Sequence, residues 1–182
     1  MAVTRRRTLV VAASAALVLG AVPAAAAIRS ETPDVALNRA FQPVGSASTA
    51  FTYDEQGVAR GATATVEAFY PGDGTTAVTL ELRGLQPFRT YGAHAHVGAC
   101  TEAPAGAGGH WHFSDAGADP LEEREIWLDV TTDEQGFAKS VALRSHEIPA
   151  GDRPMSVVVH ALPTDHVTGA AGARLACVTV PF

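Results

Sequence analysis

Apolar and polar residues alternate strictly in two neighbouring parts of this chain. Apolar side chains occupy every second position over residues 64–70 and again over residues 78–82. Between them lies the sequence Pro71-Gly72-Asp73-Gly74, which has the composition of a tight turn. A period of two residues is typical of strands that bury one face, so the pattern predicts a β-hairpin.

Further short segments have the same strand character, and Gly or Pro separates most of them: residues 47–53, 91–97, 126–131, 138–143, 156–161 and 174–180. No stretch has the period of a convincing amphipathic helix. Many short strands without helices predict an all-β sandwich or barrel. Two connections, residues 100–125 and 162–173, are long and rich in Gly, Ala and Pro, and we expect function in these loops.

The first 27 residues have the composition of an export signal. Three arginines at positions 5–7 precede an apolar stretch over residues 9–22 and an alanine run that ends at residue 27. The apolar stretch is shorter than the roughly 20 residues that span a bilayer. We therefore expect cleavage near Ala27 and a protein that is secreted or held in the cell envelope. The signal fits either the general secretory route or the twin-arginine route.

After cleavage, 182 − 27 = 155 residues remain, which suits one domain. Residues 28–46 have mixed polarity and no clear period, so we expect a flexible leader there and a folded domain over residues 47–182. The signal contains three arginines and no acid, so the net charge changes from 13 − 19 = −6 to 10 − 19 = −9. Nucleic acids and anionic membrane surfaces are poor partners for such a chain, and no stable membrane insertion is expected.

The only two cysteines, Cys100 and Cys177, both lie in the part that would be exported. An oxidising compartment favours a disulfide over a free thiol, so we expect the two to be joined.

Four histidines are candidate metal ligands. His94 and His96 are two residues apart on a predicted strand, so their side chains share one face. His110 lies in a Gly-rich loop, and His160 ends an apolar strand. Imidazole suits both oxidation states of copper, although zinc also accepts such ligands.

The other histidines have simpler interpretations. An H-x-H pattern is common by chance on exposed strands, and His112 could share the face of His110 without a role. His146, beside Glu147, is expected to be a solvated surface residue. His166 is expected at a loop surface, where it could assist near a metal.

A series of motifs resembles the Cu/Zn superoxide dismutase family over about residues 64–180. The matching runs occur in this order: Gly92-Ala93-His94-Ala95-His96, Gly98-Ala99-Cys100, Gly109-His110, Val158-Val159-His160 and Gly169-Ala170-Ala171-Gly172-Ala173-Arg174-Leu175-Ala176-Cys177. The last run is the most specific.

The resemblance implies a Greek-key β-sandwich or barrel of about eight antiparallel strands with two long functional loops. It implies an enzyme that converts superoxide into dioxygen and hydrogen peroxide at one copper ion. The implied copper ligands are His94, His96, His110 and His160, with His110 also exchanging a proton. The resemblance further implies that Arg174 guides the anion and that the family's disulfide joins the two cysteines.

Departures from the family pattern indicate a site without zinc. No histidine lies between Phe113 and Thr131, and Glu123 and Ile126 stand where a zinc histidine and the zinc aspartate are expected. A zinc site with His110 as its only nitrogen ligand would be weak. This is similar to the copper-only branch of the family, so we expect no zinc.

Without zinc, another group must orient the His110 ring. The candidates are Glu125 and Asp129, with Asp165 as a more remote choice. Two other functions remain open at this point: a non-enzymatic copper-binding or copper-storage protein, which would need no Arg174, and a purely structural secreted sandwich.

Overall fold

A computed structural model describes residues 32–114 and 116–182, so the expected export signal lies outside the described residues. The first sheet contains four antiparallel strands in the order β1-β4-β5-β9. Their bounds are Val35–Ala40, Thr63–Phe69, Thr76–Arg83 and Ala138–Arg144. The predicted hairpin is β4 and β5, in which Val66 pairs with Leu80 in the middle of the buried face.

The second sheet has the order β2-β3-β11-β10-β7. Its strands are Gln42–Pro43, Ala50–Thr52, Arg174–Thr179, Ser156–His160 and Ala93–His96. All neighbours are antiparallel except β2 and β3. A short pair, β6 (Thr90–Tyr91) and β8 (Val130–Thr131), completes the strands among the described residues.

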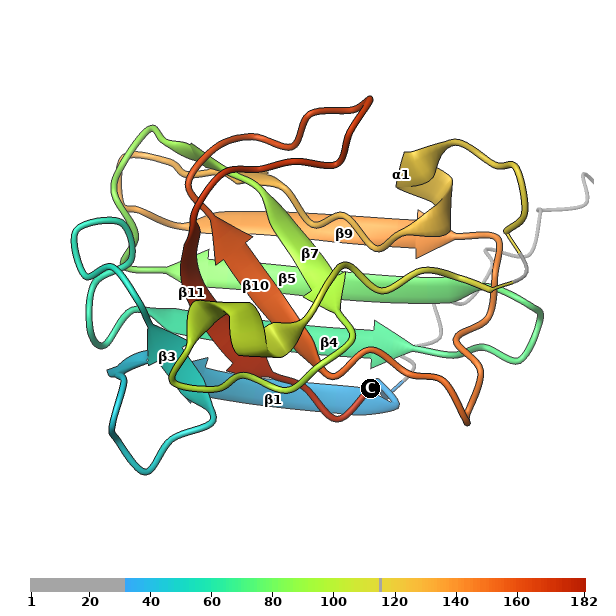
Figure 1. Ribbon diagram of the computed structural model, residues 1–182, viewed down its shortest axis with the longest axis horizontal. Coiled ribbons are helices and arrows are strands. Elements are labelled where there is room, and N and C mark those ends of the chain that lie inside the picture. The colour runs from blue at the N-terminus through green and yellow to red at the C-terminus, as the bar shows by residue number, and fades with distance from the viewer. Residues whose placement is uncertain (1–31, 115) are drawn as a thin grey trace, which may run out of the picture. The chain divides into compact units, whose positions relative to one another are not determined.

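The two sheets pack face to face. In Figure 1, β7, β10 and β11 lie in front of β1, β4, β5 and β9, and the strands of the two layers cross. The inward side chains form one apolar core that includes Val66, Val78, Leu80, Leu82 and Val159. The expected all-β sandwich is confirmed.

Helical structure in the described part of the chain is limited to two single turns. A 3₁₀ turn, η1 (Pro104–Ala107), and an α-helical turn, α1 (Leu121–Arg124), both lie in the long connection after β7. No helix within residues 32–114 and 116–182 is long and apolar enough to cross a membrane.

The expectation of a flexible leader over residues 28–46 is wrong for residues 35–43. Strand β1 pairs with β4 along its whole length, from Val35 opposite Ala68 to Ala40 opposite Thr63. Val35 is buried and Leu37 packs against the core, whereas the residues between and after them are largely exposed. Because only two side chains of this edge strand contact the core, its sequence does not show the alternation of apolar and polar residues by which a strand is recognised.

The strand expected over residues 126–131 is only partly regular. The named strand β8 covers its last two residues, and the preceding residues run along the free edge of β7. There the Ala95 N–H donates to the Ile126 carbonyl (3.1 Å) and the Leu128 N–H donates to the Ala93 carbonyl (2.7 Å). This segment therefore closes the edge of the second sheet beside the histidines of β7.

The outer face of the second sheet is covered by the connection after β7. Ala107, Val158 and Cys177 form a small buried cluster there, against which Cys100 packs. Cys100 and Cys177 are joined by a disulfide whose Cα atoms are 5.7 Å apart, as expected. The bond ties the start of the covering loop to β11.

Candidate metal centre

Strand β7 presents alternate residues to opposite sides of its sheet. Ala93 and Ala95 face the core, and His94 and His96 face the other side, where the long loops bury both side chains completely. His160 comes from the end of the neighbouring strand β10, next to a register shift between Val159 and His160. His110 comes from the covering loop, through an isolated bridge to His96.

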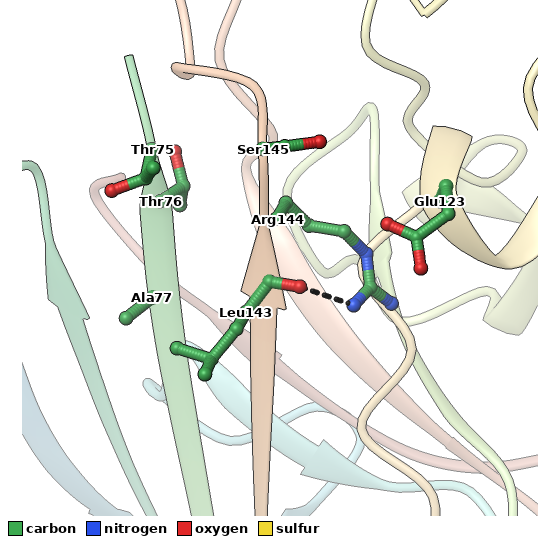
Figure 2. A pocket seen from close by; sticks show the side chains of 7 residues that line it. All are labelled: Thr75, Thr76, Ala77, Glu123, Leu143, Arg144 and Ser145. Carbon is green, nitrogen blue, oxygen red and sulfur yellow. Dashed lines mark hydrogen bonds between the residues drawn. The ribbon is translucent and has the colours of Figure 1, made fainter. Parts of the chain in front are cut away.

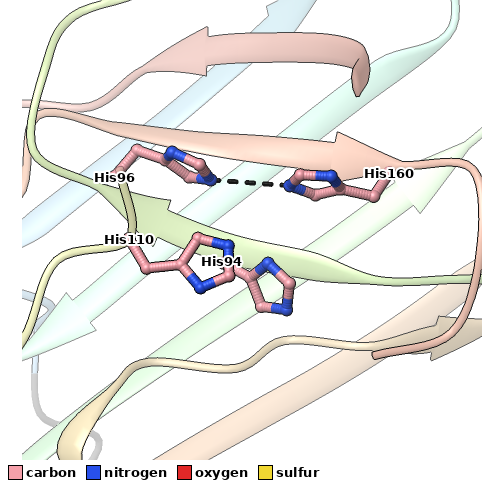
Figure 3. A group of neighbouring side chains, drawn as sticks. All are labelled: His94, His96, His110 and His160. Atoms are coloured by element: carbon pink, nitrogen blue, oxygen red, sulfur yellow. Dashed lines mark hydrogen bonds between the residues drawn. The ribbon is translucent and has the colours of Figure 1, made fainter. Parts of the chain in front are cut away.

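These four histidines form one cluster (Figure 3). One nitrogen from each ring lies within 4.8 Å of the corresponding nitrogen of every other. The structure thus brings together all four side chains that the sequence indicated as metal ligands.

Backbone carbonyls orient two of the rings. His96 Nδ1 lies 3.1 Å from the Gly108 oxygen, and His160 Nδ1 lies 3.3 Å from the Gly172 oxygen. A carbonyl oxygen can only accept, so each Nδ1 carries the proton and each Nε2 has a free lone pair. The two Nε2 atoms face each other 3.5 Å apart (Figure 3), an arrangement that a cation between them stabilises.

The His110 ring is held by a carboxylate. His110 Nδ1 donates to Glu125 Oε2 at 2.7 Å, which leaves His110 Nε2 toward the cluster. The Trp127 indole N–H donates to the same oxygen at 2.5 Å. Burial alone would raise the pKa of Glu125, but hydrogen bonds from His110 and Trp127 outweigh it, so the pKa is lowered and the carboxylate is ionised.

Glu125 is also held through its backbone. The buried Arg144 side chain donates from Nε to the Glu125 carbonyl at 2.6 Å and from Nη1 to the Leu143 carbonyl at 2.8 Å. Figure 2 shows this guanidinium turned toward Glu123 on α1. Arg144 thus connects β9 to the segment that carries the His110 acceptor.

The other two candidate carboxylates have different partners. Asp165 accepts hydrogen bonds from Val167 and Thr168 within its own loop. Asp129 accepts from Thr164, whose hydroxyl lies 2.6 Å from His94 Nε2. Among the three candidates, Glu125 is the residue that contacts His110.

Burial makes three of the rings neutral near pH 7. It lowers the pKa of His94 to about 2, that of His96 to about 3 and that of His160 to about 4. Burial is the largest cause of these lowered pKa values, and positive charge on neighbouring rings contributes to them. Neutral imidazoles with inward lone pairs are the form that binds a metal.

The donor set fits a copper ion. His94 Nδ1 is buried and has no hydrogen-bond partner. Together with the inward Nε2 atoms of the other three rings, it provides four nitrogen donors and no competing acid. Imidazole donors of this kind suit copper, and zinc and other transition metals also bind them.

Arg174 lies beside the cluster, at the start of β11. Its Nη1 donates to the Pro104 carbonyl at 2.7 Å, and its Nη2 donates to the Gly108 carbonyl at 2.5 Å. After burial, its charge is among the causes that lower the pKa values of His96 and His160. The guanidinium is therefore close enough to act on the site electrostatically.

The remaining histidines lie outside the cluster. His112 is 43% exposed, and its Nε2 lies 3.5 Å from Glu125 Oε1. His166 is 76% exposed in its loop, as expected, with Nδ1 3.5 Å from Glu122 Oε2. The prediction for His146 is wrong: its side chain is only 14% exposed, packs near Phe113 and lies 3.1 Å from Asp119 Oδ2. The loops that cover this end of the sandwich could not be placed from the sequence.

Two residues at the site were not indicated by the sequence analysis. Trp127 follows Glu125 by two residues on an extended segment, so the period of a strand could have placed both on one face. Thr164 is 70 positions from His94 in the chain, and no local signal connects them.

A groove of about 410 Å³ lies elsewhere on the surface (Figure 2) and contains none of the four histidines. Its lining residues are Thr75, Thr76, Ala77, Glu123, Leu143, Arg144 and Ser145. We assign it no part in the metal site, although Arg144 borders both regions.

One solved structure supports the fold, and a second shows a weaker similarity. The crystal structure of the clock protein EA4 is 20% identical, covers 82% of this chain and 95% of that chain, and has a TM-score of 0.51. A SOD-like protein from Bacillus subtilis is 15% identical over 65% of this chain and 89% of that chain, with a TM-score of 0.48. No curated protein sequence matches this chain.

The family is shown by a sequence model described as copper/zinc superoxide dismutase (SODC), which matches residues 61–180. The match covers most of the chain and includes all four histidines, Arg174 and both cysteines. The chain therefore belongs to the copper/zinc superoxide dismutase family.

Proposed function

We propose that the protein is an exported, copper-dependent superoxide dismutase that works without zinc. The observation that carries the proposal is the cluster of four inward imidazole nitrogens, with Glu125 holding the ring that zinc would otherwise orient. The family membership supplies the substrate class, and the disulfide is compatible with an extracytoplasmic location. His94, His96, His110 and His160 would hold the copper ion.

Copper at this site would supply the one-electron chemistry by which two superoxide anions and two protons give dioxygen and hydrogen peroxide. The residues of the chain position the metal-binding nitrogens and exchange the proton. His94, His96 and His160 keep their geometry because other parts of the chain hold the ring nitrogens that face outward. His110 is the exposed member, at 19%, and can hold a proton on Nε2 and pass it to the reduced substrate.

Glu125 supports that proton exchange. When His110 Nε2 is protonated the ring is a cation, and the ionised carboxylate 2.7 Å from Nδ1 stabilises the charge. Glu125 therefore provides the fixed partner that zinc provides in zinc-containing members. This is our basis for proposing that zinc is absent.

Arg174 would attract the substrate. The exported chain has a net charge of 10 − 19 = −9, which opposes the approach of an anion. A guanidinium held beside His96 by two carbonyls creates a local positive field at the cluster.

A copper-binding protein without enzymatic activity is the second candidate. The sandwich fold also occurs in a protein described as a clock protein, so the fold alone does not specify dismutase activity. Arg174 at the histidine cluster favours catalysis, because copper storage needs no attraction for an anion.

The deciding experiment is the rate of superoxide disproportionation by the purified protein loaded with copper alone. The matched samples are the same preparation stripped of metal and the same preparation loaded with zinc alone. We expect rapid turnover only with copper, and no gain when zinc is added to the copper form. Tight copper binding without turnover would refute the enzyme and support the second candidate.

A further inference from the structure

The Arg144 side chain carries a buried positive charge. Arg144 is the last residue of β9 and is 8% exposed, and no acid in the described part of the chain forms an ion pair with it. Burial lowers the pKa of the guanidinium, and the more distant charges of Glu123 and Glu122 raise it. A buried charge is costly unless its donors are used, so the partners of this side chain indicate its role.

Both hydrogen-bond acceptors of Arg144 are backbone carbonyls. Nη1 donates to the Leu143 carbonyl of its own strand at 2.8 Å (Figure 2). Nε donates to the Glu125 carbonyl at 2.6 Å, and this is the hydrogen bond that the carbonyl accepts among the described residues. The guanidinium is thus anchored on β9 and reaches across to the backbone of Glu125.

The chain around Glu125 leaves this carbonyl free to turn when Arg144 is absent. The preceding turn α1 has no buried residue and no side-chain cap, and a single helical turn is not stable by itself. Backbone hydrogen bonds hold the carbonyls of Arg124 and Ile126, but neither bond holds the peptide group between them. Arg144 holds that group from a strand that pairs with β5 along its whole length.

The orientation of this peptide group affects where the Glu125 carboxylate lies. Its Oε2 accepts from His110 Nδ1 at 2.7 Å and from the Trp127 indole N–H at 2.5 Å. Hydrogen bonds weaken steeply as their distance and angle depart from such values. A turn of the Glu125 backbone would therefore weaken one of these two bonds or both.

We infer that Arg144 is a positioning residue, which fixes the backbone of Glu125 and so determines the orientation of the His110 ring. The consequence for copper rests on the proposed function, whereas the placement of Glu125 is a property of the metal-free protein. The two can therefore fail separately.

The first test uses the Trp127 indole N–H as a reporter of the Glu125 carboxylate. The chain has two tryptophans, so proton–nitrogen NMR of the metal-free protein gives two indole signals. Trp111 donates to Asp152 Oδ1 at 3.2 Å and is the internal reference. Arg144→Met keeps an apolar side chain of similar length but removes the donors. We expect it to shift or broaden the Trp127 signal and to change the Trp111 signal much less.

Two further variants separate the hydrogen bond from stability in general. Arg144→Lys retains a charged donor and should shift the Trp127 signal less than Arg144→Met does. Val78→Ala opens space in the core on β5, the strand beside β9, and should lower the free energy of unfolding without shifting that signal. An unchanged Trp127 signal in Arg144→Met would overturn the inference. An equal shift in Val78→Ala would also overturn it, since the effect would then belong to the stability of the fold.

The second test is copper affinity, measured by competition with a chelator. Loss of a group that orients a metal ligand typically weakens metal binding roughly 10-fold to 100-fold. Arg144 acts on His110 through Glu125, so we expect the lower end, roughly tenfold, for Arg144→Met. Val78→Ala should bind copper as the wild type does.

Wild-type copper affinity in Arg144→Met would overturn the link from Arg144 to the metal site. Absence of dismutase turnover in the copper-loaded wild type would count against the proposed function and would leave the NMR result valid.

Discussion

The Glu125→Gln substitution tests the interpretation that a carboxylate replaces zinc as the partner of His110. Glutamine has nearly the same shape but no charge, and its amide nitrogen can only donate. The two donors on Glu125 Oε2, from His110 at 2.7 Å and Trp127 at 2.5 Å, would then meet a neutral acceptor or a competing donor. We expect the His110 ring to lose its fixed orientation and copper to bind more weakly.

The magnitude follows from the kind of hydrogen bond that is lost. A bond to a charged group contributes roughly 1.5–3 kcal/mol, against roughly 0.5–1.5 kcal/mol for a neutral pair. The difference is about 1–1.5 kcal/mol for the His110 contact, which corresponds to roughly tenfold in copper affinity. Because Glu125 is 3% exposed, water cannot replace the lost partner, so a loss of up to roughly 100-fold is consistent with this structure.

The assay is chelator competition for copper, followed by the dismutation rate per bound copper. Glu123→Gln is the matched control, because it removes the same charge from an exposed side chain two residues earlier, on α1. We expect the control to stay within about twofold of the wild type, as is usual for surface changes. Wild-type copper affinity and rate in Glu125→Gln would refute the role of the carboxylate.

Four further predictions address the surroundings of the site. Arg174→Ala should lower the dismutation rate per bound copper and flatten its dependence on salt, and an unchanged rate at low salt would exclude the guiding role. Reduction of the disulfide, whose cysteines are 77 positions apart, should lower the free energy of unfolding by roughly 4–5 kcal/mol at most, as measured by denaturant titration with and without reductant. Gly92→Ala should lower the free energy of unfolding by roughly 1–3 kcal/mol, because the new Cβ would lie 2.6 Å from a side-chain carbon of the loop over residues 162–173. Gly151→Ala should leave the free energy of unfolding unchanged, because the space around Gly151 is open. The metal-free protein should unfold at lower temperature as the pH falls from about 7 to about 5. The three buried histidines have pKa values of about 2 to about 4 and stay neutral in the folded state, whereas the same histidines take up protons in the unfolded chain. An unfolding temperature that does not change with pH would contradict these pKa shifts.

The sequence predicted the strands that bury one complete face. The alternation over β4 and β5 is visible because every second residue enters the core. Strand β1 was missed because it is an edge strand whose polar residues face away from the core. The local pattern thus reflects burial, and it weakens where burial is partial.

The candidate site was predictable to a similar degree. His94 and His96 share a face because of the strand period, but only the family resemblance connected them to His110 and His160, which come from distant segments. The choice of Glu125 over Asp129 needed the structure, since both lie close to the same loop and strand. Thr164 could not be identified from the sequence, because its contact with His94 depends on how the loop over residues 162–173 folds over β7.

The Gly108 carbonyl oxygen accepts from both His96 Nδ1 and Arg174 Nη2. A carbonyl has two lone pairs, and here both are in use. Removing one donor changes the acceptor strength available to the other, so the free-energy effects of substitutions at these two residues will not add. A double-mutant cycle should reveal this as a coupling energy between substrate attraction and ring orientation. Under the proposed function, the positive field that would attract the anion and the geometry that would hold the metal both depend on this one backbone atom.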